Sequence, residues 1–522
     1  MQKQTMPYLE YLKNPNFIAV IIALLTTGFS RLQFIAGLPT SDAGIYTFAN
    51  QWFFNAISQD IPIKDSKLFL YQFMTAWVYS LEVNQIILLR IIDGLVAIAA
   101  SIVLFKVILK ESGSALFTSI LVAALLLVMN DSEIIRTGFS NSIWAAYLPL
   151  FLALLVWQKS SKEDNFSFYL IGALVSLGIL LREAFLPFYL ITFIAIYISY
   201  GRRNSINFML GSALLGFSVI SFILMFRGWD LNNLIDRYIF LGDAYEDYID
   251  MGITFVAGIL NLIKNGWFIF TLSLASIIYF IKLKFDDKKS VSVNRIYFWI
   301  LVALIPLIEP IAKVAFHYHY SSSLIGLAGL SAMGWKYLSL KESKKTKALS
   351  IILVGLMSLF IILPTISVLT IKNNNIFTLS DAVKWAKAPN SFRSQNHIEK
   401  SQYLTLAKKI YSLSREDSTL VVSGGMQVLY PLTELLPPTF ELSWLRYLFI
   451  QLNFNEDKLI KIIEKHQPTL IVTTDWHPGE AAMSAIIDKI DLYEKVEVVP
   501  VNLNKHYGFK SGIIYRLKDF RS

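Results

Sequence analysis

The sequence contains no cysteine and few charged residues. The absence of cysteine excludes disulfides, thiolate metal sites and cysteine nucleophiles, and it leaves the redox compartment open. Charged residues make up 16% of the 522 residues, whereas a soluble protein has about 25%. No Walker motif, Gly-x-Ser-x-Gly or His-Glu-x-x-His occurs, so ATP-driven transport, serine hydrolysis and zinc proteolysis have no support.

The sequence is rich in long apolar runs. A transmembrane helix needs about 20 mostly apolar residues, and about eleven runs approach that length. They are 17–36, 85–107, 114–130, 141–158, 166–181, 185–200, 206–226, 266–283, 295–313, 322–339 and 348–371. The first run has no small-residue cleavage site after it, so we expect a retained span and not a removed signal. These runs predict a polytopic α-helical membrane protein.

The basic residues lie in loops that alternate along the chain. If the N-terminus is cytoplasmic, the loops on its side carry the following residues and ranges: Lys3, Lys13, Lys106, Lys110, Lys159, Lys162, Arg202, Arg203, 282–289 and 336–347. This pattern follows the positive-inside rule, so the net charge of +9 reflects orientation in the membrane and nucleic-acid binding is not expected. We expect a multi-pass protein of the plasma or inner membrane with its richer, more acidic loops outside.

The composition changes after about residue 372. Short apolar runs rich in β-formers (419–422, 469–473, 496–501 and 513–516) alternate with helical stretches (400–413, 455–466 and 480–489). Such alternation predicts a small α/β domain. We therefore divide the chain into a transmembrane module, 1–371, with an outer loop at 37–84, and an extracytoplasmic α/β domain, 372–522.

The outer loop 37–84 begins with an acid, Asp42, at the head of an amphipathic stretch. Apolar side chains recur at helical spacing from Ile45 to Ala56, which is typical of a helix lying on a membrane face. From its spacing alone, Asp42 is explained first by capping of that helix and second by chemistry. The two roles are compatible, because a carboxylate at a helix N-terminus stays ionised and can still accept a proton from a bound hydroxyl.

A short acidic turn, Asp131-Ser132-Glu133, lies between the third and fourth apolar runs. Its two carboxylates could hold a divalent cation such as Mg²⁺ or Mn²⁺ through oxygen ligands. The ordinary alternative is that the charged residues cap the two flanking helices. One Asp-x-Glu pair does not decide between a metal site and a pair of caps.

Arg182 and Glu183 end the fifth apolar run. Ionisable residues at membrane depth are costly and usually have a partner or a function. The pair either forms an internal ion pair, or Arg182 binds a lipid phosphate, whose geometry a guanidinium matches with two hydrogen bonds. Lys64 and Lys67 in the first outer loop could add charge to the same phosphate, or could simply be solvated.

His317 and His319 precede the tenth apolar run within Lys313-Val-Ala-Phe-His-Tyr-His-Tyr-Ser-Ser-Ser. Histidines two residues apart on a helix point to different faces, so a shared metal is not expected. The segment is typical of an aromatic belt at the membrane interface. The alternative is a site for lipid phosphate or sugar hydroxyls.

Together these features resemble the GT-C superfamily of membrane glycosyltransferases, which includes protein O-mannosyltransferases and aminoarabinose transferases. The similarity rests on the early loop acid in Ser41-Asp42-Ala43-Gly44-Ile45-Tyr46, on two juxtamembrane helices (42–58 and 66–82) and on the acidic turn. It extends to Arg182, to the polar aromatic segment before the tenth run and to the outer α/β domain.

The resemblance implies an inverting transfer of a sugar from a polyprenyl-phosphate carrier to a glycan, lipid or protein acceptor on the outer face. It implies that Asp42 is the general base and that Asp131 and Glu133 form the second acidic turn. From their charge and position we expect the donor phosphate to be bound by Arg182, Lys64, Lys67, His317 and His319. Tyr46 and Glu183 are the candidates for acceptor or sugar binding. The chain has Asp-x-Glu where the family often has Asp-x-Asp, so metal dependence stays open.

Two other functions fit the same architecture. A transporter or flippase of a lipid-linked glycan predicts related halves and polar residues near the bilayer midplane, but the sequence shows no repeat and few buried charges besides Asp93 and Glu309. A non-catalytic envelope assembly subunit would use the α/β domain as a contact surface.

Overall fold

The structure is a computed structural model. It describes residues 14–28, 69–75, 77–78, 81, 85–130, 143–182, 185–227, 255–285, 293–307, 321–339, 402–423, 426–427, 429–474, 478–500 and 511–520. The predicted helix at 42–58 and the predicted span at 348–371 lie outside these residues. Within the predicted second juxtamembrane helix, 66–82, the structure has helix α5, Phe69–Thr75.

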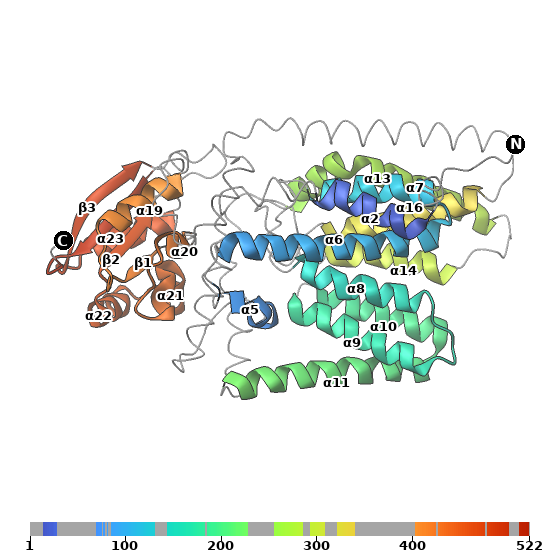
Figure 1. The fold of residues 1–522 in the computed structure, drawn as a ribbon, viewed down its shortest axis with the longest axis horizontal. Coiled ribbons are helices and arrows are strands. Elements are labelled where there is room, and N and C mark those ends of the chain that lie inside the picture. Colours follow the sequence, from blue (N-terminus) through green and yellow to red (C-terminus); the bar gives the residue numbers. More distant parts are fainter. Residues whose placement is uncertain are drawn as a thin grey trace, which may run out of the picture.

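The first part of the chain is a bundle of apolar helices (Figure 1). They are α2 (Pro15–Ala23), α6 (Gln85–Ser112), α7 (Ala115–Met129), α8 (Ile143–Trp157), α9 (Asn165–Leu181), α10 (Leu186–Tyr200), α11 (Arg202–Arg227), α13 (Phe255–Phe285), α14 (Val293–Leu304) and α16 (Ser321–Ser339). The π-helix η1 (Leu24–Gly28) continues α2, and the 3-10 turn η5 (Ile305–Leu307) follows α14. Every predicted run except 348–371 is therefore at least partly helical.

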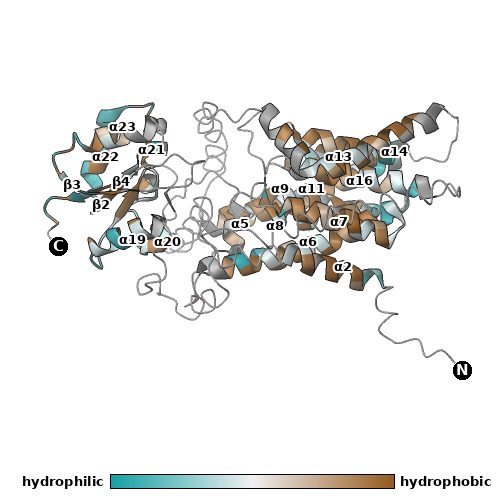
Figure 2. Cartoon of the chain, turned by 90° about the horizontal axis from the view of Figure 1, so that it is seen from above, coloured by the Kyte–Doolittle hydropathy of each residue, from teal (hydrophilic) through white to brown (hydrophobic). Residues whose placement is uncertain are grey.

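Two of these helices, over Leu88–Ser112 and Arg202–Met225, are long and apolar enough to cross a membrane, and the described residues contain several shorter apolar helices beside them. Only 22% of an 18-residue apolar stretch of the helix over Arg202–Met225 is buried within the protein. Its remaining surface carries exposed large apolar side chains, among them Leu214, Phe217 and Met225, and brown apolar residues dominate the bundle in Figure 2. An apolar surface of this extent is stable in lipid and not in water, so the helical module belongs in a membrane. The number of eleven spans stays a prediction.

Several predicted basic loops meet at one end of the bundle, which we name the basic end. The turns after α6, α8 and α10 are joined there by hydrogen bonds: Gln158 Nε2 donates to Glu111 Oε1 at 2.6 Å, and Asn204 Nδ2 donates to the Lys162 carbonyl at 3.0 Å. We name the other end, where α6, α8, α10 and α16 begin, the opposite end. In Figure 1 the C-terminal domain lies beyond the opposite end. Which end faces the cytoplasm stays a prediction.

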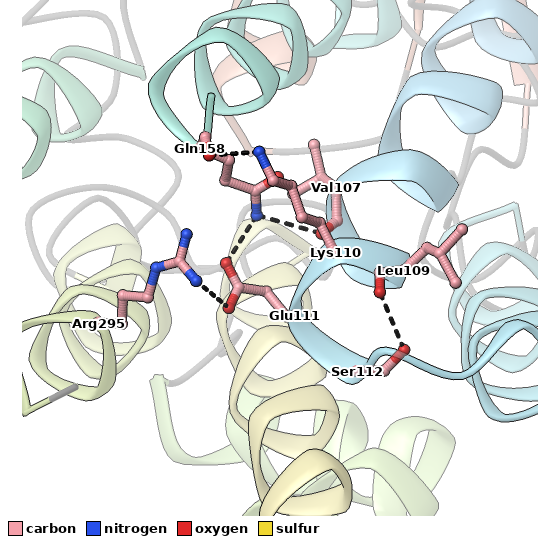
Figure 3. A network of polar contacts seen from close by, with 7 residues as sticks. All are labelled: Val107, Leu109, Lys110, Glu111, Ser112, Gln158 and Arg295. Atoms are coloured by element: carbon pink, nitrogen blue, oxygen red, sulfur yellow. Dashed lines mark hydrogen bonds and ion pairs between the residues drawn. The ribbon is translucent and has the colours of Figure 1, made fainter. Parts of the chain in front are cut away.

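A buried carboxylate organises the basic end (Figure 3). Glu111, with 1% of its surface exposed, accepts the hydrogen bond from Gln158 and lies 3.6 Å from Arg295 Nη1 at the start of α14. Lys110 donates to the backbone carbonyl of Gln158, and Gln158 Nε2 also reaches the Val107 carbonyl at 3.2 Å. A buried charge is tolerated when it is paired and hydrogen-bonded, so this network holds the ends of α6, α8 and α14 together.

Glycines allow α9 and α11 to approach closely. A Cβ placed at Gly172 would lie 2.0 Å from the carbonyl oxygen of Phe208, and one at Gly211 would lie 2.1 Å from that of Tyr169. Small residues let membrane helices pack backbone to backbone, where dispersion contacts replace the missing hydrophobic driving force. At these two glycines the backbones of α9 and α11 therefore pack directly against each other.

The C-terminal part is the α/β domain that the sequence predicts. Its sheet has the order β1-β2-β4-β3, with β1 (Leu420–Val422) parallel to β2 (Leu470–Thr474), while β4 (Ser511–Leu517) runs antiparallel to both β2 and β3 (Tyr493–Pro500). Helices α19 (Gln402–Ser412) and α20 (Leu429–Thr433) lie on one side of the sheet in Figure 2, and α21 (Leu445–Gln451), α22 (Glu456–His466) and α23 (Pro478–Ile487) lie on the other. The 3-10 turn η9 (Phe440–Ser443) joins α20 to α21.

Candidate functional site

Of the residues that the sequence analysis singles out for chemistry, the structure describes Arg182. Asp42, Tyr46, Lys64, Lys67, Asp131, Glu133, Glu183, His317 and His319 lie outside the described residues. Their roles therefore stay predictions. The structure does describe helices that precede or follow the segments carrying these residues.

Arg182 lies at the opposite end of the bundle, where α9 stops. It is the C-cap of α9: its backbone is extended, with φ −157° and ψ 109°, and its N–H donates to the Gly178 carbonyl. Its own carbonyl accepts the N–H of Phe185 at 3.1 Å, which closes the turn into α10. The side chain is half-buried. The structure therefore places Arg182 at a helix end, and its binding to a lipid phosphate stays a prediction.

The segment that carries the two histidines leads into α16 beside this turn. Tyr147 of α8 and Ser322 of α16 share a hydrogen bond of 2.7 Å between their hydroxyls. The ring of Tyr147 also packs on Phe185, with 4.8 Å between the ring centroids. Through Tyr147 the structure therefore brings the start of α16 and the turn after Arg182 together. The sequence analysis gave no role to Tyr147, because a tyrosine in an apolar run does not reveal its distant partner.

A second polar contact joins the helices that lead into the predicted loop acid and the acidic turn. Thr27 in η1 lies 2.8 Å from Ser101 of α6, between their hydroxyl oxygens. Asn130, the residue before Asp131, donates to Thr27 Oγ1 at 3.4 Å and to the Leu126 carbonyl at 2.8 Å. All three side chains are buried. The chain thus departs toward Asp42 and toward the acidic turn from two neighbouring helices.

Near its start, helix α6 carries two buried ionisable residues, and the sequence analysis named one of them. Arg90 and Asp93 have 4% and 3% of their surfaces exposed. They are three residues apart, so they lie on one helix face, within about two turns of the start of α6 at the opposite end. Asp93 was noted as a buried charge, and Arg90 was missed, although a charge inside an apolar run is by itself an indication of function.

Among the residues that the structure describes, no group of three or more histidine and carboxylate side chains is arranged to hold a cation. The carboxylates predicted for this purpose, Asp131 and Glu133, are outside the described ranges. A divalent cation at the acidic turn therefore stays a prediction.

Comparison with known proteins gives limited similarity. No protein-family model matches the chain, and no curated protein matches it. Among solved structures, an oligosaccharyltransferase from Archaeoglobus fulgidus, tethered to an acceptor peptide with an NVT sequon, is similar at a TM-score of 0.48 and 13% identity, over 97% of this chain and 74% of that one. The archaeal oligosaccharyltransferase AglB from the same organism, in complex with an inhibitory peptide and a dolichol-phosphate, is similar at a TM-score of 0.46 and 13% identity, over 90% and 70%.

Both similar structures are oligosaccharyltransferases by name. Similarity at this level establishes neither a common fold nor a common function.

Proposed function

We propose that this protein is an inverting GT-C glycosyltransferase that moves a sugar from a polyprenyl-phosphate carrier to a glycan, lipid or protein acceptor. One observation carries the proposal. The helix ends that lead into the predicted site segments are linked pairwise, by the hydrogen bond between Tyr147 and Ser322 beside the Arg182 turn and by the contacts of Thr27 with Ser101 and Asn130.

The donor side of the proposed site uses positive charge at the opposite end of the bundle. Outside the cytoplasm a sugar must bring its own activation, and a lipid phosphate supplies it as the leaving group. As the bond between the anomeric carbon and the phosphate oxygen breaks, negative charge builds on the phosphate. Arg182 would neutralise this charge together with Lys64 and Lys67, and Arg90 is a further buried cation at the same end of the bundle.

The acceptor side uses the loop acid. Asp42 would accept the proton of the acceptor nucleophile while that nucleophile attacks the anomeric carbon from the face opposite the phosphate. The new bond forms as the old one breaks, so the configuration at the anomeric carbon inverts. If a divalent cation takes part, Asp131 and Glu133 would hold it, and it would supply further stabilisation of the anionic groups.

The test is sugar transfer by the purified protein in lipid, with defined polyprenyl-phosphate sugars and soluble acceptors. Replacing Asp42→Asn removes the proton acceptor but keeps the size of the side chain, so transfer should fall by about 10²- to 10⁴-fold. Asp164→Asn is the matched control, because Asp164 caps α9 at the basic end through Ser167 and asparagine caps equally well. Transfer by the wild type with retained configuration, or full activity of Asp42→Asn, would contradict the proposal.

A further inference from the structure

The basic end of the bundle gathers more positive charge between its helix ends than the fold uses. Lys110 lies in the last turn of α6, Lys159 follows α8, and Arg295 lies in the first turn of α14. Lys110 interacts electrostatically with both Lys159 and Arg295. Among the described residues, Glu111 is the carboxylate whose charge acts on Lys110. Three positive charges and one negative charge leave a net charge of +2 in this cluster.

Orientation in the membrane does not account for this cluster. The positive-inside rule requires basic residues in the loops of one side, but not their burial between helices. Arg202 and Arg203, at the same end of the bundle, are exposed, which is sufficient for orientation. Lys110 and Arg295 are instead half-buried, and Figure 3 shows both beside the Glu111 side chain. Like charges held together in this way repel each other, so the arrangement is favoured only if an anion joins it.

The Arg295 guanidinium has hydrogen-bonding capacity that the described residues do not use. It carries five N–H donors, and its contact with Glu111 is 3.6 Å, which is longer than a hydrogen bond. The Arg295 side chain is 31% exposed, so a ligand outside the bundle can reach it. The planar guanidinium matches a phosphate group with two parallel hydrogen bonds.

The two lysines can add charge to the same ligand. Lys110 donates to the Gln158 carbonyl, which occupies one of the three donors of its ammonium group. Lys159 is exposed and forms no ion pair with any residue that the structure describes. The cluster therefore combines one guanidinium and two ammonium groups that a single phosphate group could contact.

Exposed apolar side chains border the cluster. Helix α10 ends at the basic end and packs against α14, which begins there. Tyr200, the last residue of α10, interacts electrostatically with Arg295. Tyr197 and Ile198, in the last turn of α10, are 55% and 61% exposed, and Tyr297 of α14 is 54% exposed. Tyrosine is typical of the membrane interface, so the surface changes here from cationic at the helix ends to apolar along the helices.

We propose that Lys110, Lys159 and Arg295 form a binding site for the headgroup of an anionic phospholipid, in the leaflet that borders the basic end. The lipid phosphate would bind the guanidinium and both ammonium groups, and the acyl chains would lie along α10 and α14. Basic clusters between transmembrane helices bind anionic headgroups in this way. A zwitterionic lipid would bring its own positive charge to the cluster, and a soluble phosphate would not cover the apolar side chains.

The experiment titrates the delipidated full-length protein in detergent with dioleoylphosphatidylglycerol and, separately, with dioleoylphosphatidylcholine, and measures bound lipid by native mass spectrometry. We expect phosphatidylglycerol to bind about tenfold more tightly, as for the gain of one hydrogen bond between charged groups. Arg295→Gln should remove most of this preference, and Arg295→Lys should keep part of it, because lysine keeps the charge without the planar geometry. Equal affinity of the wild type for the two lipids would overturn the proposal.

The matched control is Arg202→Gln, which removes the same charge from an exposed residue at the same end. It should keep the lipid preference of the wild type. Because Arg295→Gln also removes a partner of Glu111 and could lower stability, Lys159→Gln is the second test. It should weaken phosphatidylglycerol binding by about two- to fivefold, as for an exposed charge pair, at an unchanged melting temperature. Equal loss of preference in Arg202→Gln and Arg295→Gln, or unchanged affinity in Lys159→Gln, would overturn the site.

A further arm adds sn-glycerol 3-phosphate, which carries the phosphate without acyl chains. We expect it not to displace phosphatidylglycerol at equal concentration, because the apolar side chains on α10 and α14 bind only the lipid. Displacement at equal concentration would identify a site for soluble phosphates and contradict the lipid assignment. None of these measurements requires sugar transfer, so the result does not depend on the proposed function.

Discussion

The two ends of the helical module are built differently. At the basic end short turns connect the helices, and a buried carboxylate ties three of them together through Gln158 and Arg295. At the opposite end the helices lead into the segments that hold nearly all the predicted site residues, and the described contacts there involve hydroxyl, amide and aromatic groups such as Tyr147 and Asn130. Binding residues are commonly carried by loops on a rigid scaffold. The contacts at the basic end stabilise the bundle, and the proposed function assigns the chemistry to the opposite end.

The largest effect on activity within the described residues should come from Arg182. Arg182→Gln removes the charge that would bind the donor phosphate, and we expect kcat/KM for transfer to fall by about 10- to 100-fold, as for loss of one hydrogen bond to a charged group. Arg182→Lys keeps the charge but loses the planar guanidinium, so its kcat/KM should lie between those of the wild type and Arg182→Gln. Transfer kinetics at several donor concentrations measure both. Unchanged kinetics in Arg182→Gln would remove Arg182 from the site and weaken the contrast between the ends.

Replacing Glu111 should lower the stability of the protein and leave its transfer activity unchanged. Glu111→Ala leaves Arg295 and the Gln158 amide without their common partner, so the solubilised protein should lose about 2 kcal/mol of stability. Glu111→Gln keeps a hydrogen-bonding side chain and should lose less. Thermal unfolding in detergent gives the loss of stability, and transfer below the melting temperature should match the wild type. A drop in kcat without a change in melting temperature would mean that the basic end takes part in the chemistry.

The smallest effect should come from a solvent-exposed ion pair of the C-terminal domain. Lys518 Nζ donates to Asp491 Oδ1 at 2.6 Å, and this bond lowers the pKa of Asp491 below its ordinary value. A carboxyl whose pKa is lower in the folded state adds stability above its unfolded pKa of about 4 and loses it as the pH falls through the folded value. Asp491→Asn should therefore change the melting temperature slightly at pH 7 and not at pH 2. An equal shift at both pH values would show that packing, and not charge, matters at this position.

The sequence was sufficient to predict the helices and strands whose ends are marked by local chemistry. Residues 455–466 were expected to be helical, and α22 spans Glu456–His466, because Asn455 caps it and Gln467 ends it with a left-handed backbone at φ 42°. The four strands lie within three residues of the predicted apolar runs at both ends, because those runs are short and rich in β-formers. Residues 166–181 and 185–200, predicted as two runs, are the separate helices α9 and α10.

Other features could not be predicted because they depend on distant partners. The short helices α20 and α21 were missed, since seven residues or fewer give too little periodicity to detect. Helix α13 begins at Phe255, earlier than the predicted 266, because Lys264 and polar neighbours interrupt the apolar pattern but not the helix. The Glu111 network joins residues 47 positions apart and more, and the contact between Tyr147 and Ser322 spans 175 positions. No local pattern encodes such pairs.

The most direct test of the central claim is an experimental structure of the protein with a bound polyprenyl phosphate. We expect the phosphate at the opposite end of the bundle, with an oxygen within about 3 Å of the Arg182 guanidinium, as a charge-assisted hydrogen bond requires, and with the Asp42 carboxylate facing the same cavity. A polyprenyl phosphate bound at the basic end, or an Asp42 side chain pointing into bulk water away from any cavity, would contradict the account.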